Sequence, residues 1–203
     1  SGFSIAKNIS SYPVIATMYG FTEDELRQLI LQMVDLTTYK KSSDEIVSRM
    51  HELYNGYRFS PVASESVFNA SMCLYYLSYI QDFGEEPDQF IDPAVAHDLS
   101  KIHGILRLGR KADVEEIVDL AVRHKRIPFG QLPDILNLQS DGRLSKKGLL
   151  STLIYLGYLT YAPGENKELI VPNRAMALQF FDVYFKFLRH FSKWEMTSRS
   201  AYA

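Results

Sequence analysis

Cysteine is almost absent from this sequence, which contains only Cys73. A lone cysteine cannot form an internal disulfide, so the chain is not a disulfide-stapled secreted scaffold. A single thiol is compatible with a reducing compartment, or with a protein whose folding does not depend on redox conditions. Cys73 lies in an apolar run between Met72 and Leu74. Because free cysteine usually behaves as a small hydrophobe, we expect Cys73 to be a buried packing residue.

Long hydrophobic runs are also missing. No stretch approaches the roughly 20 apolar residues that cross a bilayer, and no basic segment followed by an apolar one opens the chain. We therefore expect a soluble, cytoplasmic protein that does not use a membrane as a partner. The chain begins with Ser1-Gly2-Phe3 and not with methionine, which favours an excised segment or a processed product over a complete natural chain.

The chain also lacks a large net charge and recognisable catalytic motifs. The net charge is −2, so the chain as a whole does not attract nucleic acid or anionic lipid. It has no Gly-x-x-x-x-Gly-Lys-Ser/Thr loop, and therefore no phosphate cradle of a P-loop ATPase. His97 and His103 lack the neighbours of a zinc site, and we find no paired carboxylates with a lysine that would predict a nuclease. We expect no catalytic residue, metal or cofactor in this chain.

The apolar content is sufficient for a folded domain. With 203 residues, of which 46% are hydrophobic, the chain can bury one sizeable core or two small ones that share an interface. Two capping boxes, Thr22 with Glu25 and Ser42 with Glu45, predict the starts of two helices. Apolar residues recur at helical spacing after each box, and the pattern breaks at Lys40-Lys41. We expect these two helices to form a hairpin.

The second helix ends in the stretch Leu53–Phe59, which we call the joint. Asn55 and Gly56 are the residue types that most readily take the left-handed conformation that closes a helix. The aromatic residues around them should fix the direction of the exiting chain by packing; they are Tyr54, Tyr57 and Phe59. Arg58 then leaves the joint as a fixed cation. Its structural interpretation is a helix cap or a partner for a nearby acidic residue.

A central buried helix is predicted over Ser66–Ile80, because this run is apolar on nearly every side. Asn69 would lie in its first turn, where its amide could bond the joint or a ligand. The following segment, Gln81–Pro93, is rich in acidic residues, glycine and proline. We interpret it as a solvated surface loop and not as a metal site, since it lacks the glycine-centred spacing of a calcium loop.

Two further helices are predicted before residue 127. The first covers Ala94–Leu108 and is interrupted at Gly104. The second is amphipathic and covers Asp113–His124. Residues 123–126 form a basic cluster at its end, which favours a charge complement to the helix dipole over a phosphate site.

From residue 128 the pattern changes to helix, turn, helix and hairpin. Helices are predicted over 132–138 and 145–156, and two β-like runs, 158–161 and 169–171, flank a turn. This order is the layout of a winged helix. A DNA reader needs basic residues on both helix and wing, and the candidates for nucleic-acid contacts are few: Arg143, Lys146 and Lys147. We therefore favour a winged helix used for packing.

The last predicted helix covers 173–194 and has no polar face, because aromatic and aliphatic residues occupy all its sides. Such a helix must be covered on most sides. It either passes through the core or packs against a partner or a following domain.

Several different short motifs follow one another along the chain. They are Pro13-Val14-Ile15-Ala16-Thr17 with Gly20–Leu26, then Tyr54–Phe59, Val67-Phe68-Asn69, Leu156–Thr160 and Val171-Pro172-Asn173. Over nearly the whole chain these motifs resemble the C-terminal portion of the predicted AAA-ATPase-like family. In these bacterial proteins a P-loop ATPase module is commonly followed by a restriction-nuclease-like domain. The Tyr-Asn-Gly-Tyr element is the most specific. The family usually has a proline where this chain has Ala70.

The resemblance implies a parent protein that binds ATP and magnesium in an upstream core, outside this chain. It also implies a role for Arg58 as a nucleotide sensor, because in ATPases of this general class an arginine from the lid reaches the nucleotide phosphates. The implied partners are the upstream ATPase core and a following domain. We do not expect nucleic acid as a partner of this chain alone.

Together these expectations describe a mainly α protein. Residues 1–127 would form a helical lid-like bundle, and residues 128–203 a winged-helix-like module with one small β-hairpin and the aromatic C-terminal helix. The expected function is that of a non-catalytic regulatory region that couples nucleotide state to a partner. Two alternatives from other classes remain, a nucleic-acid-binding winged helix and a protein–protein adaptor.

Overall fold

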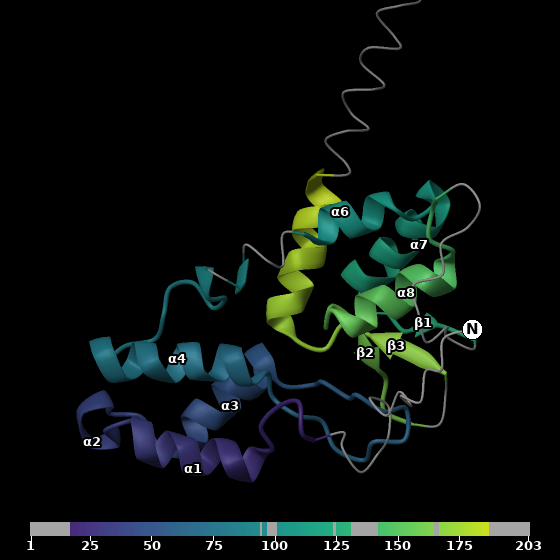
Figure 1. The fold of residues 1–203 in the computed structure, drawn as a ribbon. Helices are drawn as coiled ribbons and strands as arrows, with labels where there is room; N and C mark the ends of the chain where they lie inside the picture. Colours follow the sequence, from purple (N-terminus) through teal and green to yellow (C-terminus); the bar gives the residue numbers. More distant parts are fainter. Residues whose placement is uncertain are drawn as a thin grey trace, which may run out of the picture.

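The computed structural model describes residues 17–93, 95–96, 101–123, 125–130, 142–164 and 167–186. The fold is mainly helical with a small three-stranded antiparallel sheet, which confirms the expected mainly α class. Helices α1 to α4 lie on one side of the molecule, and α6 to α8 lie with the sheet on the other (Figure 1). Among the described residues, no helix is long and apolar enough to span a bilayer.

Both predicted capping boxes are present. Helix α1 (Glu23–Met33) begins after Thr22, whose backbone N–H donates to Glu25 Oε2 at 2.8 Å, and helix α3 (Ser43–Tyr54) begins in the same way after Ser42. The two helices pack against each other. The sequence did not predict the one-turn helix α2 (Leu36–Tyr39) between them, which ends at Lys40 with φ of 59°.

Helix α4 (Ala70–Phe83) begins four residues later than predicted. The reason is that Val67 and Phe68 are extended: Val67 forms an antiparallel bridge with Tyr57, and Phe68 forms one with Phe21. At its other end α4 continues to Phe83, so the predicted acidic loop is helical over its first residues. Cys73 is fully buried in this helix, as expected, and burial raises the pKa of its thiol.

Helices α6 (Ile102–Arg107) and α7 (Lys111–Val122) follow. The predicted interruption at Gly104 is wrong, because α6 runs through it. Glycine costs a helix interior only about 1 kcal/mol relative to alanine, and burial of Ile102 and Leu106 on the same helix outweighs that cost. His97, His124 and the predicted helix over 132–138 lie outside the described residues.

The predicted hairpin is present as β2 (Thr160–Tyr161) and β3 (Glu168–Ile170), preceded by helix α8 (Lys146–Tyr155) with Ser145 as its N-cap. The expectation of a hairpin alone is incomplete. A third strand, β1 (Ile127–Pro128), pairs with the other side of β3, so the sheet order is β1-β3-β2. This strand straddles the predicted boundary between residues 127 and 128.

Residues 174–186 are helical and lie beside α6, drawn in yellow in Figure 1. Phe180 and Val183 are buried in the core, whereas Leu178 and Phe185 are 46% and 59% exposed. Within this described part, one side of the helix is therefore in the core and the other is open, so the expected cover on that other side stays a prediction. One cluster of buried hydrophobic residues extends from α1 to this helix, so the two predicted regions share a core.

Candidate functional site

The joint between α3 and α4 is built on a single glycine. Gly56 has φ of +99°, and a Cβ on it would lie 2.1 Å from the carbonyl oxygen of Pro172. Only glycine therefore fits both the backbone conformation and the close approach. Asn55 is extended, with φ of −80° and ψ of −176°, so the expectation that it would share the left-handed conformation is wrong. The joint is pressed directly against the segment that leads into the last helix.

Asn173 connects this segment to the joint through both ends of its amide. Its Nδ2 donates to the carbonyl oxygen of Asn55 at 2.9 Å, and its Oδ1 accepts from the backbone N–H of Met176 at 3.1 Å. The second bond caps the first turn of the 174–186 helix. One side chain thus starts the last helix and fixes it to the joint.

The aromatic residues of the joint are held on several sides. Tyr54 is fully buried, and its hydroxyl donates to the carbonyl oxygen of Phe90 at 2.6 Å. The rings of Tyr57 and Phe59 stack with centroids 6.2 Å apart. Burial raises the pKa of Tyr57, and hydrogen bonding to Asn173 and Asn69 offsets part of the increase. The expected packing of aromatic side chains at the joint is therefore present.

Asn69 has a structural role at the start of α4. Its side-chain oxygen accepts from the backbone N–H of Met72 at 3.1 Å, and its own N–H donates to the carbonyl oxygen of Tyr54 at 3.0 Å. It is the N-cap of α4, one position before the first turn in which it was predicted. The same residue therefore joins the end of α3 to the beginning of α4.

The backbone of Arg58 is clamped by a residue far away in the sequence. Its N–H donates to Thr160 Oγ1 at 2.7 Å, and the Thr160 hydroxyl donates to the Arg58 carbonyl oxygen at 2.9 Å. Thr160 lies in β2 and is only 2% exposed. One buried hydroxyl therefore satisfies both backbone groups of Arg58 and fixes its position relative to the sheet.

The side chain of Arg58 has no comparable support. It is half-buried, and its buried Nε has no hydrogen-bond partner. Within the described ranges the guanidinium forms no ion pair, so the structural interpretation, a local pairing with an acidic residue, finds no partner there. Burial lowers the pKa of Arg58, although an arginine stays charged at neutral pH. Arg58 thus combines a fixed backbone with a partly desolvated guanidinium that can bind an anion such as a phosphate.

The other basic candidates are differently placed. Lys146, at the start of α8, pairs with Glu116 of α7 at 2.7 Å, and Arg143 and Lys147 are exposed. Near the strands, Arg126 pairs with Glu168 of β3 at 2.9 Å. Lys146 and Arg126 are therefore each compensated by a carboxylate of the same chain.

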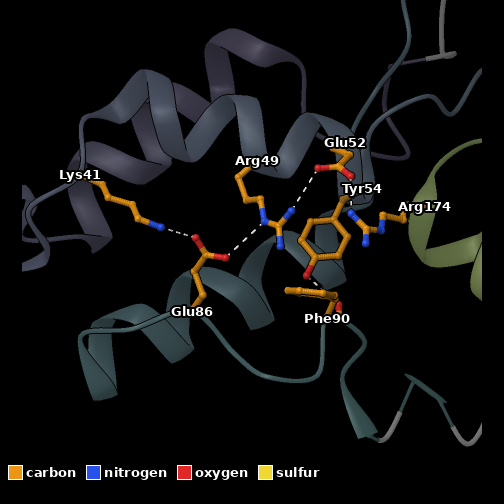
Figure 2. A network of polar contacts seen from close by, with 7 residues as sticks. All are labelled: Lys41, Arg49, Glu52, Tyr54, Glu86, Phe90 and Arg174. Atoms are coloured by element: carbon orange, nitrogen blue, oxygen red, sulfur yellow. Dashed lines mark hydrogen bonds and ion pairs between the residues drawn. The ribbon is translucent and has the colours of Figure 1, made fainter.

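A charged network that the sequence did not reveal lies beside Tyr54 (Figure 2). Arg49 Nε donates to Glu86 at 3.3 Å and Nη1 to Glu52 at 3.1 Å, while its guanidinium lies 4.8 Å from the Phe90 ring centroid. Lys41 pairs with the second oxygen of Glu86, and Arg174 pairs with Glu52 at 2.5 Å. The network connects α3 to the segment after α4 and to the last helix.

Glu86 is an exception to the expected solvated surface loop of residues 81–93, in which Asp82, Glu85 and Asp88 are exposed. Its side chain is 24% exposed. Burial alone would raise the pKa of this carboxyl, but hydrogen bonds and charge from Lys41 and Arg49 outweigh the effect, so its pKa lies below the ordinary value. Glu86 therefore holds the loop to α3.

The described residues contain no group of three or more histidine, cysteine or carboxylate side chains that could hold a metal ion. Comparison with family models, with curated proteins and with solved structures finds no match. The geometry of the joint and the motifs of the sequence are therefore the features that bear on function.

Proposed function

We propose that this chain is a non-catalytic regulatory region that follows the ATPase core of an AAA-ATPase-like protein. Arg58 would sense the nucleotide phosphates, and the joint would transmit that contact to a partner or a following domain. The observation that carries this proposal is the contrast within Arg58, whose backbone is bonded at both polar groups while its buried Nε has no partner.

The chemistry of the side chain supports this role. A guanidinium is planar and can make two parallel charge-assisted bonds to phosphate oxygens. A desolvated cation gains more from such an anion than an exposed one, because the local dielectric constant is lower. ATP and magnesium would belong to the upstream core, and this chain would supply only Arg58.

The positions of the resemblance motifs also support the proposal. Gly56 of the Tyr-Asn-Gly-Tyr element meets Pro172, and Asn55 meets Asn173. A Cβ on Gly157 would lie 3.5 Å from the Tyr57 ring. Motifs that are far apart in the sequence therefore meet at the joint, as expected if they move together as one rigid unit.

The finer architecture is part of the same proposal. The order α7, β1, α8, β2, β3 with sheet order β1-β3-β2 fits a winged-helix-like module that packs against a lid-like bundle formed by α1 to α4. Use of this module for nucleic-acid binding is disfavoured, because Glu116 and Glu168 compensate Lys146 and Arg126 and DNA affinity depends on free phosphate contacts.

The test uses the longer protein in which this chain follows its ATPase core. We expect Arg58→Lys to lower ATP turnover by roughly tenfold or more, since a lysine cannot make the paired contact to phosphate. The matched control is Arg123→Lys, which changes an exposed arginine of the same charge. Turnover is measured at saturating ATP. If Arg58→Lys leaves both the turnover and the melting temperature unchanged, the proposal is contradicted.

A calorimetric titration of the 203-residue chain alone gives an independent check. Without a phosphate cradle, Arg58 by itself should bind ATP only weakly. Micromolar affinity in the isolated chain would mean that a nucleotide site exists here, and the division of roles between core and lid would be wrong.

A further inference from the structure

The outer side of α4 carries aromatic side chains where a surface helix normally carries charge. Tyr75, Tyr79 and Phe83 follow one another at helical spacing. Their ring centroids are 6.4 Å apart for the first pair and 4.6 Å apart for the second. Phe83 is 66% exposed, and Leu74 on the adjoining row is 42% exposed. We call these four residues the α4 ridge. Tyr75 and Tyr79 are half-buried. A partly exposed aromatic patch of this kind is typical of an interaction surface.

The border of the ridge is negatively charged. Asp82, Glu85 and Asp88 are all exposed, and across the described residues none of them forms an ion pair with a cation. No lysine or arginine occurs between Arg58 and Lys101 in the sequence. The exposed carboxylates of Asp82, Glu85 and Asp88 should therefore favour lysine or arginine over nucleic acid and anionic lipid as a partner.

The same part of the chain already holds cations by this combination of groups. Arg49 lies over the Phe90 ring while it bonds Glu86, and Lys41 pairs with Glu86 while it lies 5.4 Å from the Tyr39 ring centroid. An aromatic face next to a carboxylate is favourable for a cation, because the ring quadrupole and the charge act together. The ridge offers the same pairing to solvent, with no cation of this chain close to it in sequence.

We infer that the α4 ridge is a docking surface for a basic protein segment. Apolar side chains of that segment would pack on Tyr79 and Phe83, and its lysines or arginines would face Asp82, Glu85 and Asp88. The inference uses neither Arg58 nor the joint, so it stands apart from the proposed nucleotide-sensing role.

The test is a fluorescence anisotropy titration of the chain with a labelled synthetic amphipathic peptide of leucine and lysine. We expect micromolar binding that weakens with added salt. The matched probe has glutamate in place of each lysine and should bind roughly tenfold more weakly or worse. The double variant Tyr79→Ala/Phe83→Ala should lose at least as much affinity for the lysine peptide. Leu31→Ala, which removes a side chain that is 64% exposed on α1, should bind like the wild type.

A second variant keeps the test decisive if the aromatic substitutions disturb folding. Asp82→Lys/Glu85→Lys changes only exposed residues, so its melting temperature should stay near that of the wild type, while binding of the lysine peptide falls roughly tenfold. Equal binding of the two peptides overturns the inference. So does self-association of the chain that Tyr79→Ala/Phe83→Ala abolishes, because the ridge would then bind a second copy. Binding to vesicles of anionic lipid through the ridge would overturn it too.

Discussion

Arg49 and Arg58, which lie on either side of Tyr54 in the sequence, have opposite environments in the fold. Arg49 donates to Glu86 through Nε and to Glu52 through Nη1, and its guanidinium lies over the Phe90 ring. Arg58 has a firmly bonded backbone but a buried Nε without a partner. Arg49 therefore connects segments of the fold through its side chain. Arg58 is held in position by its backbone, and its side chain makes no such connection among the described residues.

The difference suggests how to separate structural from functional charge in this molecule. A half-buried cation without a partner costs free energy, because its desolvation is not compensated. Such a cost is tolerated where it serves binding or regulation. The contacts that surround the two arginines also differ. Neutral hydrogen bonds and close backbone contact fix the joint at Arg58, whereas Arg49 lies in a chain of ion pairs.

We expect the largest effect from Gly56→Ala, because Gly56 lies in the joint that positions Arg58. The new Cβ would meet the Pro172 carbonyl and the residue would retain a positive φ, so we expect a loss of about 3 kcal/mol in the free energy of unfolding. Urea denaturation measures it. Gly84→Ala is the control, because Gly84 also has a positive φ but a Cβ there would have nothing within 4 Å. Equal losses in the two variants would show that the contact with Pro172 is unimportant.

Thr160→Val should have the next largest effect. It removes the hydroxyl that bonds both backbone groups of Arg58 and leaves them unpaired in a buried place. We expect a loss of about 2 kcal/mol in urea denaturation. Thr160→Ser keeps the hydroxyl and should lose clearly less. If valine is tolerated as well as serine, the clamp does not fix Arg58.

The sequence predicted those features whose partners lie within a helical turn of each other. Thr22 with Glu25 and Ser42 with Glu45 were identified because a capping box is a local pattern. The helix after Ser145 and the hairpin β2–β3 were identified from periodicity and turn residues. Strand β1 was missed, because two residues, one of them proline, show no alternation, and only pairing with the distant β3 makes them a strand.

The candidate site depends on contacts that local patterns do not encode. The sequence placed Arg58 after a rigid turn, but its clamp comes from Thr160, which is 102 residues away. Asn55 was expected to be left-handed, and its extended conformation is explained only by the approach of Pro172 and Asn173. Glu86 is 45 residues from Lys41 and 37 from Arg49, so its acidic surroundings in the sequence suggested a solvated loop.

The two arginines can be compared directly by replacing each with leucine. Arg49→Leu leaves Glu86 and Glu52 with one cation each, and we expect it to cost about 2 kcal/mol of unfolding free energy. Arg58→Leu removes an uncompensated charge and keeps much of the apolar stem, so stability should stay within about 0.5 kcal/mol of the wild type. Arg27→Leu is a useful control, because Arg27 also bonds two carboxylates but lies on the surface, and it should cost less than Arg49→Leu. A similar cost for Arg49→Leu and Arg58→Leu would remove the distinction between the two sites.

The smallest effect concerns the response of the Arg49 network to acid. The folded pKa of Glu86 lies below its ordinary value near 4.5, so Glu86 binds a proton more readily in the unfolded chain than in the folded one. Its stabilising contribution is therefore complete above about pH 5 and is lost as the pH falls through the lower folded pKa. Glu86→Gln should be less stable than the wild type at neutral pH by about 1 kcal/mol, and the difference should shrink on acidification. Glu85→Gln, which removes an exposed neighbouring charge outside the network, controls for overall charge. Unfolding free energies measured by urea between about pH 7 and pH 3 give the comparison, and a difference between wild type and Glu86→Gln that does not change with pH would mean that Glu86 does not act through its charge.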